Sequence, residues 1–421
     1  MAPCQIIPAR GPFVARPSVP PLPVSSSLSR SIPVLAFASC CSMSVQRMCD
    51  PMLPALAQEF HSNLAEVAWV ISLFAIAYGL MQIVYGPLAD RIGKFRVVAF
   101  TTLMCSVGCL ASALAPDLTW LVASRVLVAA FAAAIIPVSM AWVGDNTPYE
   151  IRQETLARVG LGTMLGLVSG QIIGGVFTDT AGWRWGFAFV GLLFLLAGST
   201  MWLDPRARPG TERRADLPTN AAAIGHTPWQ QARHVLSQRR ARRILGTVLL
   251  HGASFFGAFA LVASHLHESL HISLSHSGVL AGLFGLGGVL YMLAAKHVIR
   301  RLGTTGLCRG GGTLVVMSLA TIAFCPWWPA VALASLVSGV GFSMFHNTLQ
   351  AHASEMAPGM RGIGMSLFAG TLFTGQSIGV VITSTLSGSL GMGMLIALGG
   401  CSMLTLALLF PTLMRHAPAH P

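Results

Sequence analysis

Charged side chains are scarce in this chain. Only 10% of its 421 residues are Asp, Glu, Lys or Arg and 54% are hydrophobic, whereas about 25% of the residues of a typical soluble protein are charged. This composition excludes an ordinary soluble domain and indicates a membrane protein. Acidic residues are scarcer than basic ones, with 14 Asp and Glu against 26 Lys and Arg, so the formal net charge is +12. The arginines lie singly between apolar runs, without a basic stripe or interleaved aromatics, which argues against a nucleic-acid partner.

Several chemical motifs are absent as well. The sequence has no G-x-x-x-x-G-K-[S/T] phosphate loop, so we expect an ion gradient rather than a nucleotide to supply energy. Its nine cysteines include no C-x-x-C pair, and most lie inside apolar runs as small hydrophobic residues. Four histidines could suggest a metal site, but they lack Cys or carboxylate ligands at suitable spacing, and we interpret them as part of a polar loop: His265, His267, His271 and His276. We therefore expect no metal, no cofactor and no catalytic residue.

Long apolar runs are what the chain has instead. A membrane-spanning helix needs about 20 mainly apolar residues. Twelve such stretches are present, at 32–57, 67–88, 96–115, 118–143, 156–178, 185–203, 244–266, 277–297, 305–325, 328–351, 362–386 and 390–413. The predicted fold class is therefore an all-α integral membrane protein with twelve transmembrane helices.

The positions of Lys and Arg predict the orientation of these helices. Basic residues concentrate in alternate connections, and the other connections are almost bare, with Arg184 as the exception. By the positive-inside rule, both termini are predicted to be cytoplasmic. Eight of the nine tryptophans fall at predicted helix ends, where interfacial rings are favoured. The two patterns agree on one multi-pass topology, which we place in a bacterial inner membrane.

A polar segment at 204–243, punctuated by Pro and Gly, divides the chain six helices to six. The halves resemble each other weakly, since SGQIIG at 169–174 has a counterpart, TGQSIG, at 374–379. Two pseudo-symmetric six-helix bundles are typical of a secondary transporter. The predicted organisation is a disordered cytoplasmic arm at 1–31, an N-terminal bundle at 32–203, a cytoplasmic linker at 204–243, a C-terminal bundle at 244–413 and a cytoplasmic tail at 414–421.

The stretch GPLADRIGKFR, Gly86 to Arg96, resembles the signature G-x-L-x-D-R-x-G-[RK]-[RK] between helices 2 and 3 of the major facilitator superfamily, and departs from it only at Phe95. Arg125, in LVASRVLV, resembles the intramembrane arginine motif of that family, with alanines in place of the usual glycine. GLVSGQIIGG at 166–175 is similar to the antiporter motif, with Gln171 in place of its proline. With DPMLP at 50–54 and FHNTLQ at 345–350, the resemblance favours the twelve-helix drug and sugar efflux branch of drug:proton antiporters.

The resemblance implies that the first signature latches the two halves together on the cytoplasmic side when the transporter opens outward. Arg91 could then reach acids after the fourth helix, such as Asp145. The residues expected to form this cytoplasmic gate are Gly86, Asp90, Arg91, Gly93, Lys94, Asp145 and Arg152.

Ionisable residues inside the membrane are costly and by default mark a functional site. Asp50 and Arg125 lie at matching depth in their predicted helices, and Arg47 lies one turn from Asp50. We interpret Asp50 as a proton-binding group, and the two arginines stabilise its ionised form. A purely structural ion pair is the alternative.

Four further polar residues are candidates for the cavity. Gln171 and Gln376 occupy matching places in the two halves, where each lines a central cavity or makes a hydrogen bond between helices. His251 and His346 are titrating groups or neutral packing histidines.

These features predict a monomeric secondary transporter that exports a small amphipathic or uncharged compound in exchange for protons by alternating access. Its partners are the substrate, protons and the lipid bilayer. A sugar or small-metabolite efflux permease is the alternative within the class. A membrane enzyme or a non-transporting receptor is the alternative of another class, although the sequence has no carboxylate pair or metal cluster within a helix and no appended soluble domain.

Overall fold

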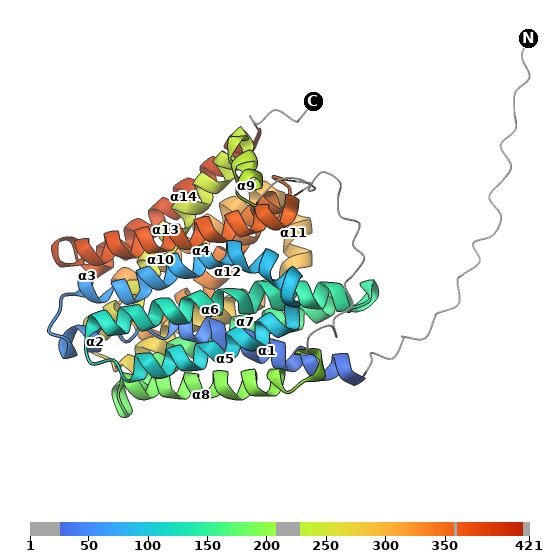
Figure 1. The fold of residues 1–421 in the computed structure, drawn as a ribbon. Coiled ribbons are helices and arrows are strands. Elements are labelled where there is room, and N and C mark those ends of the chain that lie inside the picture. Colours follow the sequence, from blue (N-terminus) through green and yellow to red (C-terminus); the bar gives the residue numbers. More distant parts are fainter. Residues whose placement is uncertain (1–25, 208–227, 358–359, 416–421) are drawn as a thin grey trace, which may run out of the picture.

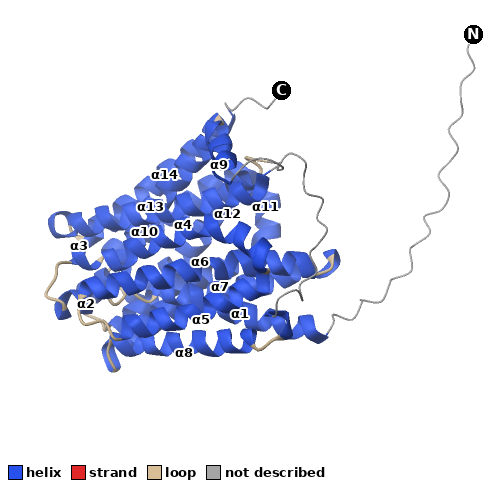
Figure 2. Cartoon of the chain, in the orientation of Figure 1, coloured by secondary structure: helices blue, strands red, loops and turns tan. Residues whose placement is uncertain are grey.

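The computed structural model describes residues 26–207, 228–357 and 360–415, and these ranges are helical with short connections (Figure 1). Figure 2 shows no strand among them. The helices are α1 (Ser26–Arg47), α2 (Leu53–Glu59), α3 (Leu64–Val67), α4 (Trp69–Ile92), α5 (Lys94–Ala113), α6 (Leu118–Asn146), α7 (Tyr149–Thr180), α8 (Trp183–Trp202), the 3-10 turn η1 (Pro205–Ala207), α9 (Pro228–Ser237), α10 (Arg239–Leu270), α11 (Leu274–Phe324), α12 (Trp328–Ser354), α13 (Arg361–Leu390) and α14 (Met392–Arg415).

Ten helical segments of the described chain are long and apolar enough to cross a membrane. One of them, α11, contains two crossings, because Gly303 has φ 60° and ψ −179° and kinks the helix in its middle. The remaining crossing is α1, which corresponds to the first of the predicted apolar stretches, 32–57. The twelve-helix, all-α membrane fold predicted from the sequence is thereby confirmed.

The first predicted helix, 32–57, is broken in the structure. The end of α1 is Arg47, residues 48–52 form turns, and α2 begins at Leu53. Pro51 explains the break, because proline lacks an N–H donor and disfavours helical backbone at the preceding residue. Asp50 is therefore placed in a turn rather than on a regular helix.

Three predicted segments lie partly outside the described residues. These are 1–25 of the N-terminal arm, 208–227 of the linker and 416–421 of the tail. The described part of the arm, from Ser26, belongs to α1, and the described part of the linker contains η1, α9 and the start of α10.

Small residues bring the helices of each bundle into close contact. On α7, a Cβ added to Gly166 or Gly174 would lie 2.2 or 2.0 Å from a backbone carbonyl oxygen of α1 or of the turn after it. On α13, a Cβ added to Gly375 or Gly379 would lie 2.1 Å from a carbonyl oxygen of α10. Such glycines permit backbones to approach in a membrane. The repeated S/T-G-Q motif therefore has the same packing role in both halves.

The two halves meet along α7 and α11 and along α4 and α13. Tyr78 of α4 packs on Phe373 of α13 with ring centroids 4.7 Å apart. Near the end of the bundle that carries α2 and α3, Asp179 of α7 accepts hydrogen bonds of 2.6 Å from the N–H and hydroxyl of Ser275 on α11. At the opposite end, near α9, a Cβ added to Gly86 or Gly362 would meet nothing within 4 Å. The halves are thus in direct contact at the α2–α3 end, at the left of Figure 1.

Candidate functional site

Asp50 is fully buried in the turn between α1 and α2. Its Oδ2 accepts a hydrogen bond of 2.7 Å from Nε2 of Gln171 on α7. The same oxygen lies 3.8 Å from Nη1 of Arg47. Oδ1 has no hydrogen-bond partner within the described chain. A buried carboxylate with one oxygen satisfied and one free can accept a proton without breaking its contact to Gln171.

Arg125, on α6, is also fully buried, but it does not form an ion pair with Asp50. Its Nη1 donates a 2.8 Å hydrogen bond to the carbonyl of Val45, and its guanidinium carbon lies 4.1 Å from the ring centroid of Phe74. The carbonyls of the last helical turn have no partner within the helix, and a cation is favourable at a helix C-terminus. Arg125 therefore caps the broken end of α1, and Arg47 is the direct ionic partner of Asp50.

Arg47 connects this site to the second half of the molecule. Its guanidinium carbon lies 4.3 Å from the ring centroid of Phe256 on α10, a geometry typical of a cation–π interaction. The side chain is only 3% exposed. One residue thus contacts the buried carboxylate of the first bundle and an aromatic ring of the second.

The two glutamines have different surroundings. Gln171 makes the hydrogen bond between helices that the sequence left open as an alternative to lining a cavity. Gln376 is buried on α13, where its backbone N lies 3.1 Å from the Cβ position of Gly252 on α10, and its side-chain oxygen has no partner within the described ranges. Gln376 is therefore not hydrogen-bonded to a carboxylate as Gln171 is, because the second half has no Asp or Glu in its interior.

His251 of α10 and His346 of α12 lie together. His251 Nε2 and His346 Nδ1 are 3.4 Å apart, and the ring centroids are 5.5 Å apart. Phe342 lies against both rings, at centroid distances of 5.0 and 5.1 Å. The sequence singled out the two histidines but missed Phe342, because phenylalanine is too common in these helices to attract notice.

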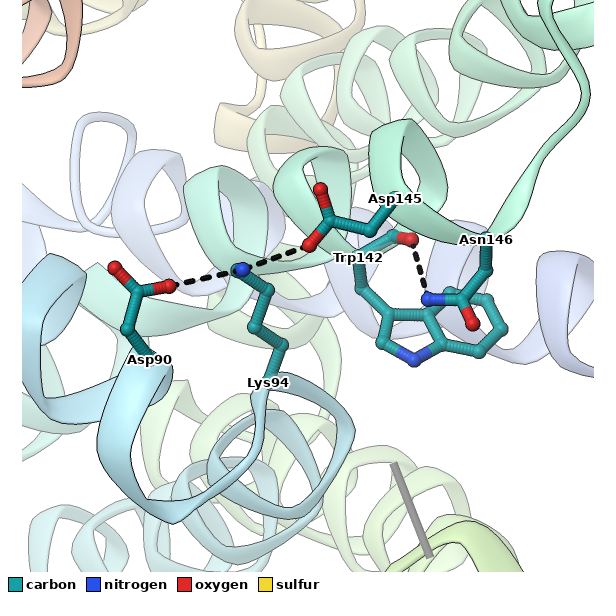
Figure 3. A network of polar contacts seen from close by, with 5 residues as sticks. All are labelled: Asp90, Lys94, Trp142, Asp145 and Asn146. Atoms are coloured by element: carbon teal, nitrogen blue, oxygen red, sulfur yellow. Dashed lines mark hydrogen bonds and ion pairs between the residues drawn. The ribbon is translucent and has the colours of Figure 1, made fainter. Parts of the chain in front are cut away.

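The predicted gate residues lie at the α9 end of the first bundle, where Lys94 is the central residue (Figure 3). Its Nζ lies 2.9 Å from Oδ1 of Asp90 and 2.7 Å from Oδ2 of Asp145. Gly93, with φ 108°, makes the turn between α4 and α5 that sets this geometry. Nearby, Asn146 donates to the carbonyl of Trp142 at 2.9 Å. Lys94 therefore joins the start of α5 to the ends of α4 and α6.

Two further gate residues, Arg91 and Arg152, lie near this network. Arg91 is exposed in this conformation, and Asp145 pairs with Lys94. Lys94 begins α5 beside the turn, whereas Arg91 lies in the last turn of α4. Arg152 donates hydrogen bonds of 3.3 and 3.2 Å to the carbonyl of Thr147, at the start of α7.

Comparison with known proteins agrees with this architecture. Residues 35–380 match the sequence model of the Major Facilitator Superfamily. A multidrug resistance protein B homolog of Mycobacterium tuberculosis is 27% identical over 91% of this chain and 81% of its own length. A lincomycin resistance protein of Streptomyces lincolnensis is 27% identical over 60% of this chain and 62% of its own length.

Solved structures show the same fold. A bacterial homolog of the human lysosomal transporter Spinster matches with a TM-score of 0.72 at 16% identity, covering 93% of this chain and 96% of its own. A mutant of the nucleoside transporter NupG matches with a TM-score of 0.76 at 13% identity, covering 91% of this chain and 99% of its own. The chain is thus a multi-pass membrane transporter and not an enzyme, and it belongs to the Major Facilitator Superfamily.

Proposed function

We propose that this transporter is a monomeric proton-coupled exporter of small amphipathic or uncharged compounds in a bacterial inner membrane. The observation that carries the proposal is Asp50, the one fully buried carboxylate among the described residues. Its charge is costly in this setting, because few groups compensate it. Relatives named as a multidrug resistance protein B homolog and a lincomycin resistance protein support export as the direction.

Proton binding at Asp50 has a mechanical consequence in this geometry. While Asp50 is ionised, Arg47 has a counter-ion at 3.8 Å and remains over Phe256 of the second half. Protonation removes that counter-ion, so Arg47 gains freedom to reorient and the contact between the halves weakens. Arg125 stays on the Val45 carbonyl and holds the broken end of α1 in place. In this proposal, coupling arises because the ionised carboxylate holds Arg47 in its contact with the opposite bundle, and protonation releases it.

The conformation described here is, in this proposal, the inward-facing state of an alternating-access cycle. The positive-inside rule assigns the α9 end, with Arg91, Lys94 and Arg152, to the cytoplasm, together with both termini. That end is where Gly86 and Gly362 have open space around them. The substrate would enter from the cytoplasm there, and rocking of the two bundles would then close that end.

Proteoliposomes loaded with a pH-sensitive dye test the proposal. An imposed pH gradient should drive uptake of a fluorescent amphipathic compound by the wild type and by Asp50→Glu, which keeps a titratable group. Asp50→Asn should bind the compound but lose gradient-driven uptake by at least about tenfold. Glu154→Gln, at an exposed pair with Arg158, serves as the matched control and should behave as wild type. Uphill transport by Asp50→Asn at the wild-type rate would rule out this coupling site.

A further inference from the structure

Three nearly parallel rings form a stack between α10 and α12. The Phe342 and His346 planes are 12° apart, those of His251 and Phe342 are 22° apart, and those of the two histidines are 26° apart. His251 and Phe342 are buried, at 0% and 8% exposure, whereas His346 is partly exposed. Each ring centroid lies 5.0 to 5.5 Å from the other two, so the rings lie side by side, and His346, which also lies 5.5 Å from Phe368 of α13, is the ring of this stack with exposed area. A partly exposed aromatic ring is a favourable surface for another planar aromatic group.

Polar residues continue from this ring along α12. Ser343, His346 and Gln350 follow one another at helical spacing on the same face, and all three are at least partly exposed. Amide, hydroxyl and imidazole groups facing lipid would lack hydrogen-bond partners. We therefore place this face away from lipid, and it extends toward the α9 end, where Glu355, the C-cap of α12, pairs with Arg240 at the start of α10.

Acidic residues are scarce in the second half, which contains the stack. Beyond Asp216 the sequence contains two acids only, Glu268 and Glu355. Glu268 lies in the last turn of α10, and Glu355 is the C-cap of α12. No carboxylate therefore lies within the spanning interior of the second half, since the sequence supplies none there.

A cation does approach the stack from the first half. The guanidinium carbon of Arg47 lies 4.3 Å from the ring centroid of Phe256, and that ring is 5.4 Å from the ring of Phe342. The carboxylate of Asp50 is already shared between Arg47 and Gln171. The buried charged residues of the described chain are Arg47, Asp50 and Arg125, a set with a net positive charge. This net charge would repel a lipophilic cation bound at His346, whereas a neutral or anionic compound would avoid this repulsion.

We propose that the substrate stacks on the His346 ring beside Phe342, and that this site selects planar aromatic compounds that are neutral or carry one negative group over lipophilic cations. Ser343 and Gln350 supply polar contacts for its hydrophilic end. The proposal rests on the proposed export function and specifies the substrate class of that function. It makes an unusual prediction, because aromatic rings alone would favour a cation.

Binding to the purified full-length protein in lipid nanodiscs tests the selectivity directly. The probes are 2-naphthoate, 2-naphthalenemethanol and N-methylquinolinium, which have similar bicyclic area and differ in charge. Equilibrium dialysis at pH 7.5 should give Kd values at least about tenfold lower for the first two, a difference of about 1.4 kcal/mol. N-methylquinolinium binding as tightly as 2-naphthoate, or no binding of 2-naphthoate, would overturn the proposal.

Variants then locate the site. His346→Leu should weaken 2-naphthoate binding by about tenfold, because it removes the accessible ring and its polar nitrogens. His297→Leu, at an exposed histidine on α11, is the matched control and should leave binding unchanged. Equal binding by His346→Leu and wild type would show that the site lies elsewhere. Asp50→Asn should keep the selectivity while losing proton coupling, so failure of the binding site and failure of the coupling mechanism are distinguishable.

Discussion

Two glycines of the first bundle have opposite surroundings and give a matched test of its packing. A Cβ at Gly174 would lie 2.0 Å from the carbonyl oxygen of Met48, whereas a Cβ at Gly86 would meet nothing within 4 Å. Gly174→Ala should therefore destabilise the folded protein by about 1–3 kcal/mol through overpacking against backbone. Gly86→Ala, inside α4 and with open space for a methyl group, should instead stabilise the protein slightly, by about 0.5–1 kcal/mol. Loss of monodisperse protein on heating in detergent measures both, and equal midpoints would contradict the close approach of α7 to the turn after α1.

Residue types and spacing predict which side chains belong to the buried site but not how they pair. Asp50 and Arg47 are three residues apart on one segment, so their proximity follows from local geometry. The Asp50–Arg125 contact was suggested by matching depth, yet depth says nothing about the rotation of a helix about its axis. Rotation turns Arg125 to the Val45 carbonyl and Gln171 to Asp50. The sequence could not supply that rotation.

At the scale of elements, an ionic cluster ties α2 to α8. Glu59, at the end of α2 and outside the spanning segments, accepts hydrogen bonds from the Trp183 indole and the Arg184 guanidinium. Arg184 is the basic residue that departs from the positive-inside pattern, and its ion pair with Glu59 offsets the charge. Its position is thus explained by a contact between helix ends that topology rules do not include.

This cluster predicts a dependence of stability on pH. Burial opposes ionisation of Glu59, but the hydrogen bonds from Arg184 and Trp183 hold the pKa of its carboxyl below the ordinary value. A carboxyl with a lowered pKa contributes stability above the unfolded value, about 4.3, and loses it as pH falls through the folded pKa. The wild type should therefore lose more thermal stability than Glu59→Gln between pH 6 and pH 3.5. Parallel melting curves of the two proteins over this range would exclude the contribution.

The length of the apolar runs predicts the membrane-spanning helices well, and the predicted helix that differs has a local cause. The predicted helix 32–57 is interrupted because Pro51 lacks an N–H donor. Hydropathy does not detect this, so the break was not predicted. Residues 274–324 contain the two predicted crossings, 277–297 and 305–325, which are joined through the kink at Gly303. Hydropathy thus locates the membrane crossings, and backbone chemistry decides where a helix breaks.

At the scale of the whole molecule, two bundles related by weak sequence symmetry have unequal roles. The first contains the buried carboxylate and its arginines, and the second contains the ring stack and no interior carboxylate. In the proposed cycle, proton binding and substrate binding are divided between the bundles, and Arg47 is the contact through which one affects the other.

Asp90 provides the last test, since its surroundings should change between the two states of that cycle. Here its side chain is 66% exposed and pairs with Lys94, which also binds Asp145 (Figure 3). The start of α13, near Gly362, is the corresponding end of the other bundle, and a helix N-terminus attracts a carboxylate. Closure of the cytoplasmic end would bring Asp90 to that terminus, a contact of about 1–2 kcal/mol that shifts a balanced equilibrium several-fold.

Asp90→Asn should consequently leave folding and membrane insertion unchanged, slow turnover several-fold and increase exposure of the open end. A cysteine introduced at Gly362, in the otherwise identical wild-type and Asp90→Asn proteins, reports that exposure through its rate of labelling from the cytoplasmic side. Glu154→Gln is again the control, because Glu154 is an exposed acid that pairs with Arg158 of its own helix. Faster labelling in Asp90→Asn alone fits a latch between the bundles. Identical labelling and turnover in the wild type, Asp90→Asn and Glu154→Gln would show that Asp90 has no part in the conformational cycle and only pairs locally with Lys94.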